Sequence, residues 1–229
     1  MIPEQTISTL VRNNEKRKKW NVVEGGQNNE CHPVIKRALQ IRNLECAVKE
    51  GVTKAQHENL IDSRLADLYQ IVLNDEDKHK LQLDELAKHY GVGELDVRDD
   101  LYQKYLQISQ TENPLMLNYA IELLVFINIL PLFQRYGDPF AANVASWILL
   151  DEARHIAIGR AITQIYPLTQ PAIKFALEVL KFVIGDLPEK SEIVANAKKS
   201  LERIPSTGLT SVVPPTINFF EVDVNSIKY

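Results

Sequence analysis

The chain has 229 residues, which is enough for one sizeable domain with a buried core and short for two. Hydrophobic residues make up 45% and charged residues 24%, and the net charge of -4 excludes a generally basic nucleic-acid-binding face. Two cysteines without a Cys-x-x-Cys pair argue against a disulfide framework or a zinc ribbon. The polar N-terminus lacks the apolar stretch of a secretory signal, so we expect a cytoplasmic protein.

The first 32 residues are expected to form an irregular arm, since Gly25–Asn29 is a loop signal. The basic run Lys16–Lys19 is typical of a solvated surface. Pro33 fits the first turn of a helix, and Glu45 falls within the apolar pattern that follows. That pattern comprises Ile35, Ala38, Leu39, Ile41, Leu44 and Val48.

A second helix is predicted from about Asp62 to Tyr90, with Asp62 or Ser63 as its N-cap and Gly91 as its C-terminal stop. Its apolar stripe is interrupted by Glu76 and His79. The apolar stripe of this second helix consists of Leu65, Leu68, Tyr69, Val72, Leu83 and Leu86. After it, residues 95–111 are predicted to form a polar, amphipathic connecting helix.

The stretch Pro114–Gln134 is long and apolar enough to be weighed as a membrane span. Its one charged side chain, Glu122, argues against that, because a carboxylate at mid-span is costly without a partner. The turn signal Gly137–Pro139 then leads into a helix over about residues 140–165. Helices over 171–184 and 189–204 and an extended C-terminal tail over 205–229 follow, so the predicted class is all-α.

Two stretches share one pattern: Asp75–His79 and Asp151–His155 both read Asp-Glu-x-(Lys or Arg)-His. Glu and His three residues apart lie on one face of a helix. Two such Glu-x-x-His motifs on two helices form half of a carboxylate di-metal site in a four-helix bundle, and two further helices must each supply a Glu.

The two missing carboxylates are found at matched spacing. Glu122 precedes Glu152 by 30 residues with Gly137 midway, so a hairpin turning there places both at one height. Glu45 precedes Glu76 by 31 residues. The predicted metal ligands are therefore Glu45, Glu76, His79, Glu122, Glu152 and His155.

Glu45 is the less certain ligand, because no Gly or Pro marks a turn midway between it and Glu76. A turn at Gly51 would separate the two carboxylates by roughly 28 Å at about 1.5 Å per residue. We therefore expect the first helix to continue through Gly51 to near Glu58. Glu50 is the competing ligand, but five residues from Glu45 it points away from that face.

Four carboxylates and two neutral imidazoles balance two divalent cations, and these ligand types suit an Fe/Fe pair and a Mn/Fe pair alike. Asp75 and Asp151, four residues before each motif histidine, are placed to orient an imidazole through its other N–H. Lys78 and Arg154 are placed to pair with these aspartates. The other histidines, His32, His57 and His89, are expected at the surface.

At these residues the chain resembles the ferritin-like di-iron carboxylate superfamily. Asp151–His155 is similar to a signature of small bacterial di-iron oxygenases, and the resemblance covers about residues 34–166. It implies a ferritin-like four-helix bundle over 33–204 with additional C-terminal helices. Asn218–Glu221 resembles a C-terminal stretch of ribonucleotide reductase small subunits, but Leu83 stands where those proteins carry a radical tyrosine. Ile148 stands where some arylamine N-oxygenases carry a seventh ligand.

The resemblance implies an oxidoreductase: an O₂-dependent di-iron monooxygenase or oxidase with two iron ions and O₂ as co-substrate. We expect a small or apolar organic substrate, an external ferredoxin or reductase as electron donor, and neither nucleic acid nor membrane as partner; a homodimer is compatible. Apolar residues expected to lie beside the site are Leu115, Leu124, Val125, Ala145, Trp147, Ile148 and Leu149. The alternatives are ferroxidase activity with iron storage, and a reductase-like metal protein that activates a partner.

Overall fold

The computed structural model describes residues 2–17, 19–28, 30–93 and 100–204. Within these ranges the chain forms helices and no β-strand, so the predicted all-α class is confirmed. The expected tail over 205–229, with the reductase-like stretch, lies outside the described residues, as does the first part of the predicted 95–111 helix.

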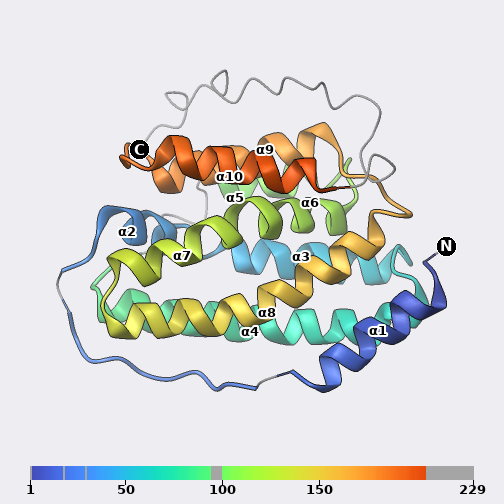
Figure 1. The fold of residues 1–229 in the computed structure, drawn as a ribbon, viewed down its shortest axis with the longest axis horizontal. Helices are drawn as coiled ribbons and strands as arrows, with labels where there is room; N and C mark the ends of the chain where they lie inside the picture. The colour runs from blue at the N-terminus through green and yellow to red at the C-terminus, as the bar shows by residue number, and fades with distance from the viewer. Residues whose placement is uncertain (1, 18, 29, 94–99, 205–229) are drawn as a thin grey trace.

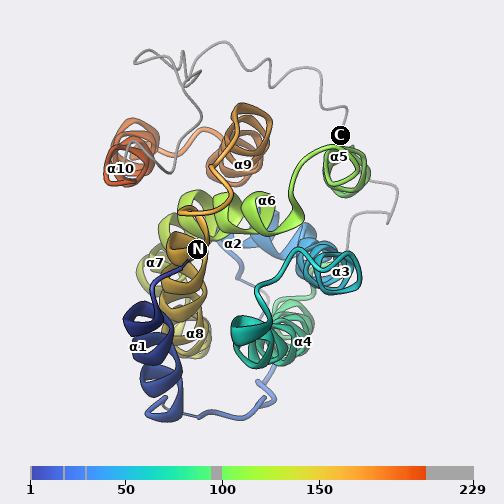
Figure 2. The same ribbon diagram turned by 90° about the vertical axis from the view of Figure 1, so that its right-hand side faces the viewer.

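Four helical segments form the centre of the fold (Figures 1 and 2). Helix α3 (Leu44–His57) packs on α4 (Ala66–His89), and α8 (Pro139–Ile162) packs on both α4 and α7 (Ile127–Tyr136). Helix α6 (Pro114–Ile121) contacts α3 and continues into α7 through a π-helical segment, η2 (Glu122–Phe126).

The remaining helices cover this centre. Helices α9 (Gln170–Ile184) and α10 (Lys190–Glu202) lie along the face made by α6, η2 and α7, and α2 (Pro33–Gln40) contacts α9, α4 and α7. Helix α5 (Asp100–Ile108) packs on α3 and α9. These helices therefore shield the apolar helix that carries Glu122.

The first helix, α1 (Glu4–Glu15), contradicts the expectation of an irregular arm over all of residues 1–32. It packs on α8 and α4, and Ile2 and Ile7 are buried there. Tertiary packing supplies most of the stability of a short helix, so a modest amphipathic pattern suffices once a partner surface exists.

The first core helix behaves as predicted at its end and differs at its start. Helix α3 continues through Gly51 to His57, and Asn59 then adopts a positive φ of 56°. Pro33 stands in the first turn of α2 as expected, but a turn over residues 41–43 separates α2 from α3. Glu45 therefore lies in the first turn of a new helix rather than within one continuous helix.

The ends of the other core helices lie close to where the sequence predicts them. Asp62 caps a short 3₁₀ turn, η1 (Ser63–Leu65), before α4, and Gly91 takes the positive φ of 62° that ends a helix without a Cβ clash. Asp138 caps α8 by accepting from the amide of Ala141. The stretch Pro114–Tyr136 is long and apolar enough to cross a membrane, and 78% of its most apolar window is buried inside the protein.

Candidate metal centre

The structure brings the six predicted ligands together at the centre of the four core segments. Glu45 comes from α3, Glu122 from η2, and the two Glu-x-x-His motifs from α4 and α8. Each of the six residues is at most 4% exposed. The competing Glu50 lies at the surface, where it accepts a hydrogen bond from Tyr102 at 3.0 Å, so the preference for Glu45 agrees with its position.

Two of the carboxylates lie between the two imidazoles. Glu76 places Oε2 3.6 Å from Nδ1 of His79 and Oε1 3.2 Å from Nδ1 of His155. Glu152 places Oε1 3.3 Å from Nδ1 of His79 and Oε2 3.7 Å from Nδ1 of His155. Each of these two glutamates thus offers one oxygen to each half of the site, which is the arrangement of a bridging carboxylate.

The other two carboxylates flank this pair at opposite ends. Ligand atoms of Glu45, Glu76 and His79 lie within 4.8 Å of one another, and so do those of Glu76, Glu122 and His155. The Oε1 atom of Glu122 is 3.7 Å from Nδ1 of His155. The arrangement therefore contains two clusters that overlap at Glu76, each with one imidazole and one terminal carboxylate.

Many polar atoms here lack a hydrogen-bond partner, although they are buried. They include both carboxylate oxygens of Glu76, both of Glu152, Oε2 of Glu45, and Nδ1 of each motif histidine. Buried polar groups without partners are rare and costly in native proteins. Carboxylate oxygens and imidazole nitrogens that converge on one centre are suitable ligands for a pair of divalent cations.

Burial also disturbs the protonation of these groups. It raises the pKa of Glu45 and of Glu122 well above the usual carboxyl range, and it raises the pKa of Glu152 to about 7. The negative charge of Glu76 also raises the pKa of Glu45 and of Glu122. The carboxylates therefore repel one another, and either protons or bound cations must neutralise them.

The two aspartates orient the histidines across the motifs rather than within them. Asp151 Oδ2 is 3.2 Å from Nε2 of His79, and Asp75 Oδ2 is 3.5 Å from Nε2 of His155. The sequence predicted their role but placed each aspartate beside the histidine of its own helix. The crossed pairing holds both Nε2 atoms away from the centre and leaves both Nδ1 atoms facing it.

Cationic side chains surround the aspartates, as predicted. Lys78 lies 3.2 Å from Asp75 Oδ1 and 3.1 Å from Asp151 Oδ2. Arg154 contacts Asp75 at 3.1 Å and also pairs with Asp151. Both bridge the two aspartates, so they join α4 to α8 directly beside the histidines.

Two residues of the N-terminal arm join this network, and sequence analysis missed both. Arg17 donates from Nη1 to both carboxylate oxygens of Asp75 at 3.0 Å, although its basic run was expected to be solvated. The indole N–H of Trp20 donates to Asp151 Oδ2 at 2.8 Å. The interleaved Arg and Trp were the only local signal, and their partners lie 58 and 131 residues away.

The π-helical segment was also missed. The amide of Ile127 donates to the carbonyl of Glu122, five residues back, so the helix widens where it presents its carboxylate. The Asn128 side chain donates to the Leu124 carbonyl at 3.0 Å, and Pro131 lies inside α7. Asn128 and Pro131, within an otherwise apolar helix, were the available signs in the sequence of an irregular helix. Such an irregularity is of interest here because π-bulges frequently occur at functional sites.

Two of the remaining histidines depart from the expected surface position. His89 is 8% exposed; its Nε2 lies 2.7 Å from Asp138 Oδ2, and its Nδ1 contacts the carbonyl of Gly26. His32 is half-buried, caps α2 and stacks on Tyr136. Only His57 is exposed as expected. His89 is buried because the N-terminal arm folds back over the end of α4 and contacts it through Gly26 and Asn28.

Comparisons with protein-family models, with curated proteins and with solved structures gave no match. The assignment of the site therefore depends on its own geometry and on the chemistry of its donors.

Proposed function

We propose that this chain is a cytoplasmic, O₂-dependent di-iron oxygenase or oxidase built on a ferritin-like four-helix bundle. The observation that carries the proposal is the position of Glu76 and Glu152, each of which turns one oxygen to each histidine. A site for one metal ion would need only one of the two clusters.

The residues divide naturally between two ions. His79 and Glu45 would hold one ion, and His155 and Glu122 the other. Glu76 and Glu152 would be shared, because each has one oxygen near each histidine. Both Fe/Fe and Mn/Fe pairs suit these donors. A bound di-iron pair supplies the electrons that activate O₂ for oxidation of an organic substrate.

The protein itself would perform positioning and exclusion of water. Asp151 contacts Nε2 of His79 at 3.2 Å and Asp75 lies 3.5 Å from Nε2 of His155, so both imidazoles would present Nδ1 as the ligand. All four glutamate residues are at most 4% exposed, which keeps bulk water from the centre. The two electrons would come from a separate ferredoxin or reductase.

The test is anaerobic loading with Fe(II), removal of free metal, elemental analysis and then exposure to O₂ with optical spectroscopy. We expect about two iron ions per chain, as the two clusters require, and an optical change that depends on O₂. Fewer than two bound ions in the unchanged protein would refute the proposal. A large cage in solution would favour iron storage over an oxygenase.

A second candidate is a metal protein that activates a partner by one-electron exchange. Its support is a continuous hydrogen-bonded chain from half-buried Trp20 through Asp151 to His79. Replacement of Trp20 by Phe would then abolish partner activation while metal loading remains complete. An oxygenase that acts alone would keep its substrate oxidation in this variant.

A further inference from the structure

Residues 19–28, here called the strap, lie across α4 and α8 without forming a helix (Figure 1). Near one end, the indole N–H of Trp20 donates to Asp151 on α8. In the middle, the amide of Val23 donates to Gln82 Oε1 at 2.9 Å, and Gln82 Nε2 donates to the Val23 carbonyl at 3.0 Å. The strap is therefore fixed to both helices that carry the motif histidines.

The other end of the strap is held by His89, the last residue of α4. Its Nδ1 contacts the carbonyl of Gly26, and its Nε2 lies 2.7 Å from Asp138 Oδ2. Its backbone carbonyl accepts from the amide of Asn28 at 2.7 Å, and its buried ring packs edge-on against Phe140. His89 thus joins the strap, the end of α4 and the start of α8.

Both ring nitrogens of His89 face oxygen atoms that accept hydrogen bonds. The Gly26 carbonyl can only accept. Burial raises the pKa of Asp138, but hydrogen bonds from Ala141 at 3.0 Å and Asn28 at 2.9 Å outweigh burial and lower it to about 2, so this carboxyl is ionised. A neutral imidazole carries one N–H, so only the imidazolium form donates to both oxygens.

The other titratable groups at this junction keep their charge between pH 5.5 and 8.5. Tyr90 lies edge-on to the His89 ring, and its hydroxyl accepts from the amide of Asp138 at 3.2 Å. Burial raises the pKa of Tyr90 to about 12 and that of Cys31, on the arm, to about 11, so both stay neutral. Imidazole is the side chain whose charge ordinarily changes in this range.

We propose that His89 is a pH-sensitive latch, whose imidazolium form fastens the strap to Asp138 and whose neutral form lets the strap loosen. A neutral ring keeps only one of the two contacts, because its bare nitrogen then faces an oxygen lone pair. The latch is therefore closed at low pH and opens as the pH rises through the titration of the imidazole. A loosened strap withdraws Trp20 from Asp151, which orients His79.

The experiment is hydrogen–deuterium exchange of the iron-loaded full chain at pH 5.5, 7.0 and 8.5, with millisecond mixing and mass spectrometry of strap peptides. Rates are divided into those of an unstructured peptide at the same pH, which gives a protection factor. The amides of Val23 and Asn28 are the reporters, because both donate to α4. Their protection should fall at least fivefold from pH 5.5 to 8.5, while that of α9, which packs on α6, changes less than twofold. Equal strap protection at all three pH values would overturn the inference.

Matched variants assign the response to one residue. His89→Gln removes the titrating group, so strap protection should already be low at pH 5.5 and change less than twofold up to pH 8.5. His57→Gln, at an exposed position on α3, is the control and should keep the pH response of the unchanged protein. A pH response that persists in the His89→Gln protein would overturn the assignment.

Only the link from the latch to the metal centre rests on the proposed function. At pH 6.0 a chelator should remove iron from the His89→Gln protein at least threefold faster than from the His57→Gln protein, and equal rates would overturn that link. If fewer than two ions are held but strap protection depends on pH through His89, the proposed function fails and the latch stands. If two ions are held and strap protection ignores pH, the latch fails and the proposed function stands.

Discussion

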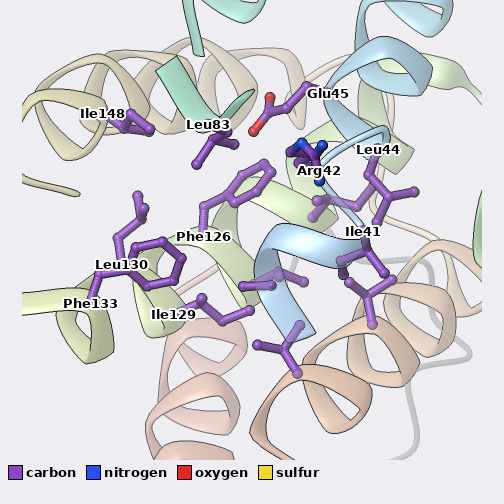
Figure 3. A pocket seen from close by; sticks show the side chains of 15 residues that line it. Ile41, Arg42, Leu44, Glu45, Leu83, Phe126, Ile129, Leu130, Phe133 and Ile148 are labelled. Atoms are coloured by element: carbon purple, nitrogen blue, oxygen red, sulfur yellow. The ribbon is translucent and has the colours of Figure 1, made fainter. Parts of the chain in front are cut away.

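The two halves of the metal centre share a ligand pattern but differ in their surroundings. The half with Glu45, Glu76 and His79 borders a small, mainly apolar cavity that Glu45 helps to line (Figure 3), and a turn in the chain precedes its first ligand. The half with Glu122, Glu152 and His155 packs against Tyr119, whose ring lies where a side chain at Gly159 would be. The near-repeat in sequence therefore has different surroundings in its two halves: the cavity lined by Glu45 has a volume of about 40 Å³, and the one lined by His155, between α1, α4 and α8, has a volume of about 140 Å³.

The groups behind the histidines differ as well. Asp151, which orients His79, accepts from the neutral indole of Trp20, whereas Asp75, which orients His155, pairs with the cation of Arg17. Lys78 and Arg154 serve both aspartates. The bridging ligands are thus common to both halves, while the surrounding cavities and the electrostatic support of the histidines are specific to each.

The largest effect should come from the bridging ligands, which both halves need. Glu152→Ala removes oxygens near both histidines, so bound iron should fall from about two ions per chain to less than one. Elemental analysis after anaerobic loading measures this. Glu50→Ala, at an exposed carboxylate on the same helix as Glu45, is the control and should retain both ions. Two ions in the Glu152→Ala protein would contradict the shared role.

The next effect concerns the orienting aspartates. Asp75→Asn and Asp151→Asn should each lower iron affinity about 10- to 100-fold, because each leaves one imidazole without its carboxylate partner. Competition with a chelator measures the affinity of each ion. Asp77→Asn, at an exposed position on α4, is the matched control. If the two variants weakened the same ion, the crossed pairing between the halves would be wrong.

The close packing of Gly159 against Tyr119 can be tested by adding one methyl group. A Cβ at position 159 would lie 2.7 Å from Cγ and 3.0 Å from Cβ of Tyr119, and these atoms cannot swing away because they are close to the backbone. Gly159→Ala should therefore lower the free energy of unfolding by about 1–3 kcal/mol, despite a better helix propensity. Urea denaturation measures the change.

Gly93 is the control for that substitution. A Cβ there meets nothing within 4 Å, so Gly93→Ala should stay within about 0.5 kcal/mol of the unchanged protein. An unchanged stability for Gly159→Ala would show that Gly159 and Tyr119 are less tightly packed than the contacts indicate.

The smallest effects should come from the two arm residues that contact the aspartates, the neutral Trp20 at Asp151 and the charged Arg17 at Asp75. Trp20→Phe and Arg17→Met should each lower the free energy of unfolding by about 1 kcal/mol, since both contacts are partly exposed. The Arg17 effect should shrink in 1 M NaCl, because salt screens ion pairs, and the Trp20 effect should not. Lys19→Met, at an exposed position, is the control. The same salt response in both variants would remove this difference between the halves.

The sequence alone determined the parts of this protein that depend on local periodicity and spacing. The helical period placed Glu76 with His79, and Glu152 with His155, on one face of each helix. The matched separations of about thirty residues predicted Glu45 and Glu122, and caps such as Asp62 and Gly91 marked helix ends. These features need only the regular geometry of a helix, so a single sequence was sufficient.

Tertiary structure decided everything that depends on how separate segments meet. The crossed pairing of Asp75 with His155 and of Asp151 with His79 joins α4 to α8 and has no expression in either helix alone. The contact of Trp20 with Asp151 spans 131 residues, and α1 is stable only against the surface that it covers. The different cavities beside the two halves of the centre likewise arise from packing, because nearly the same ligand spacing can be surrounded by quite different neighbours.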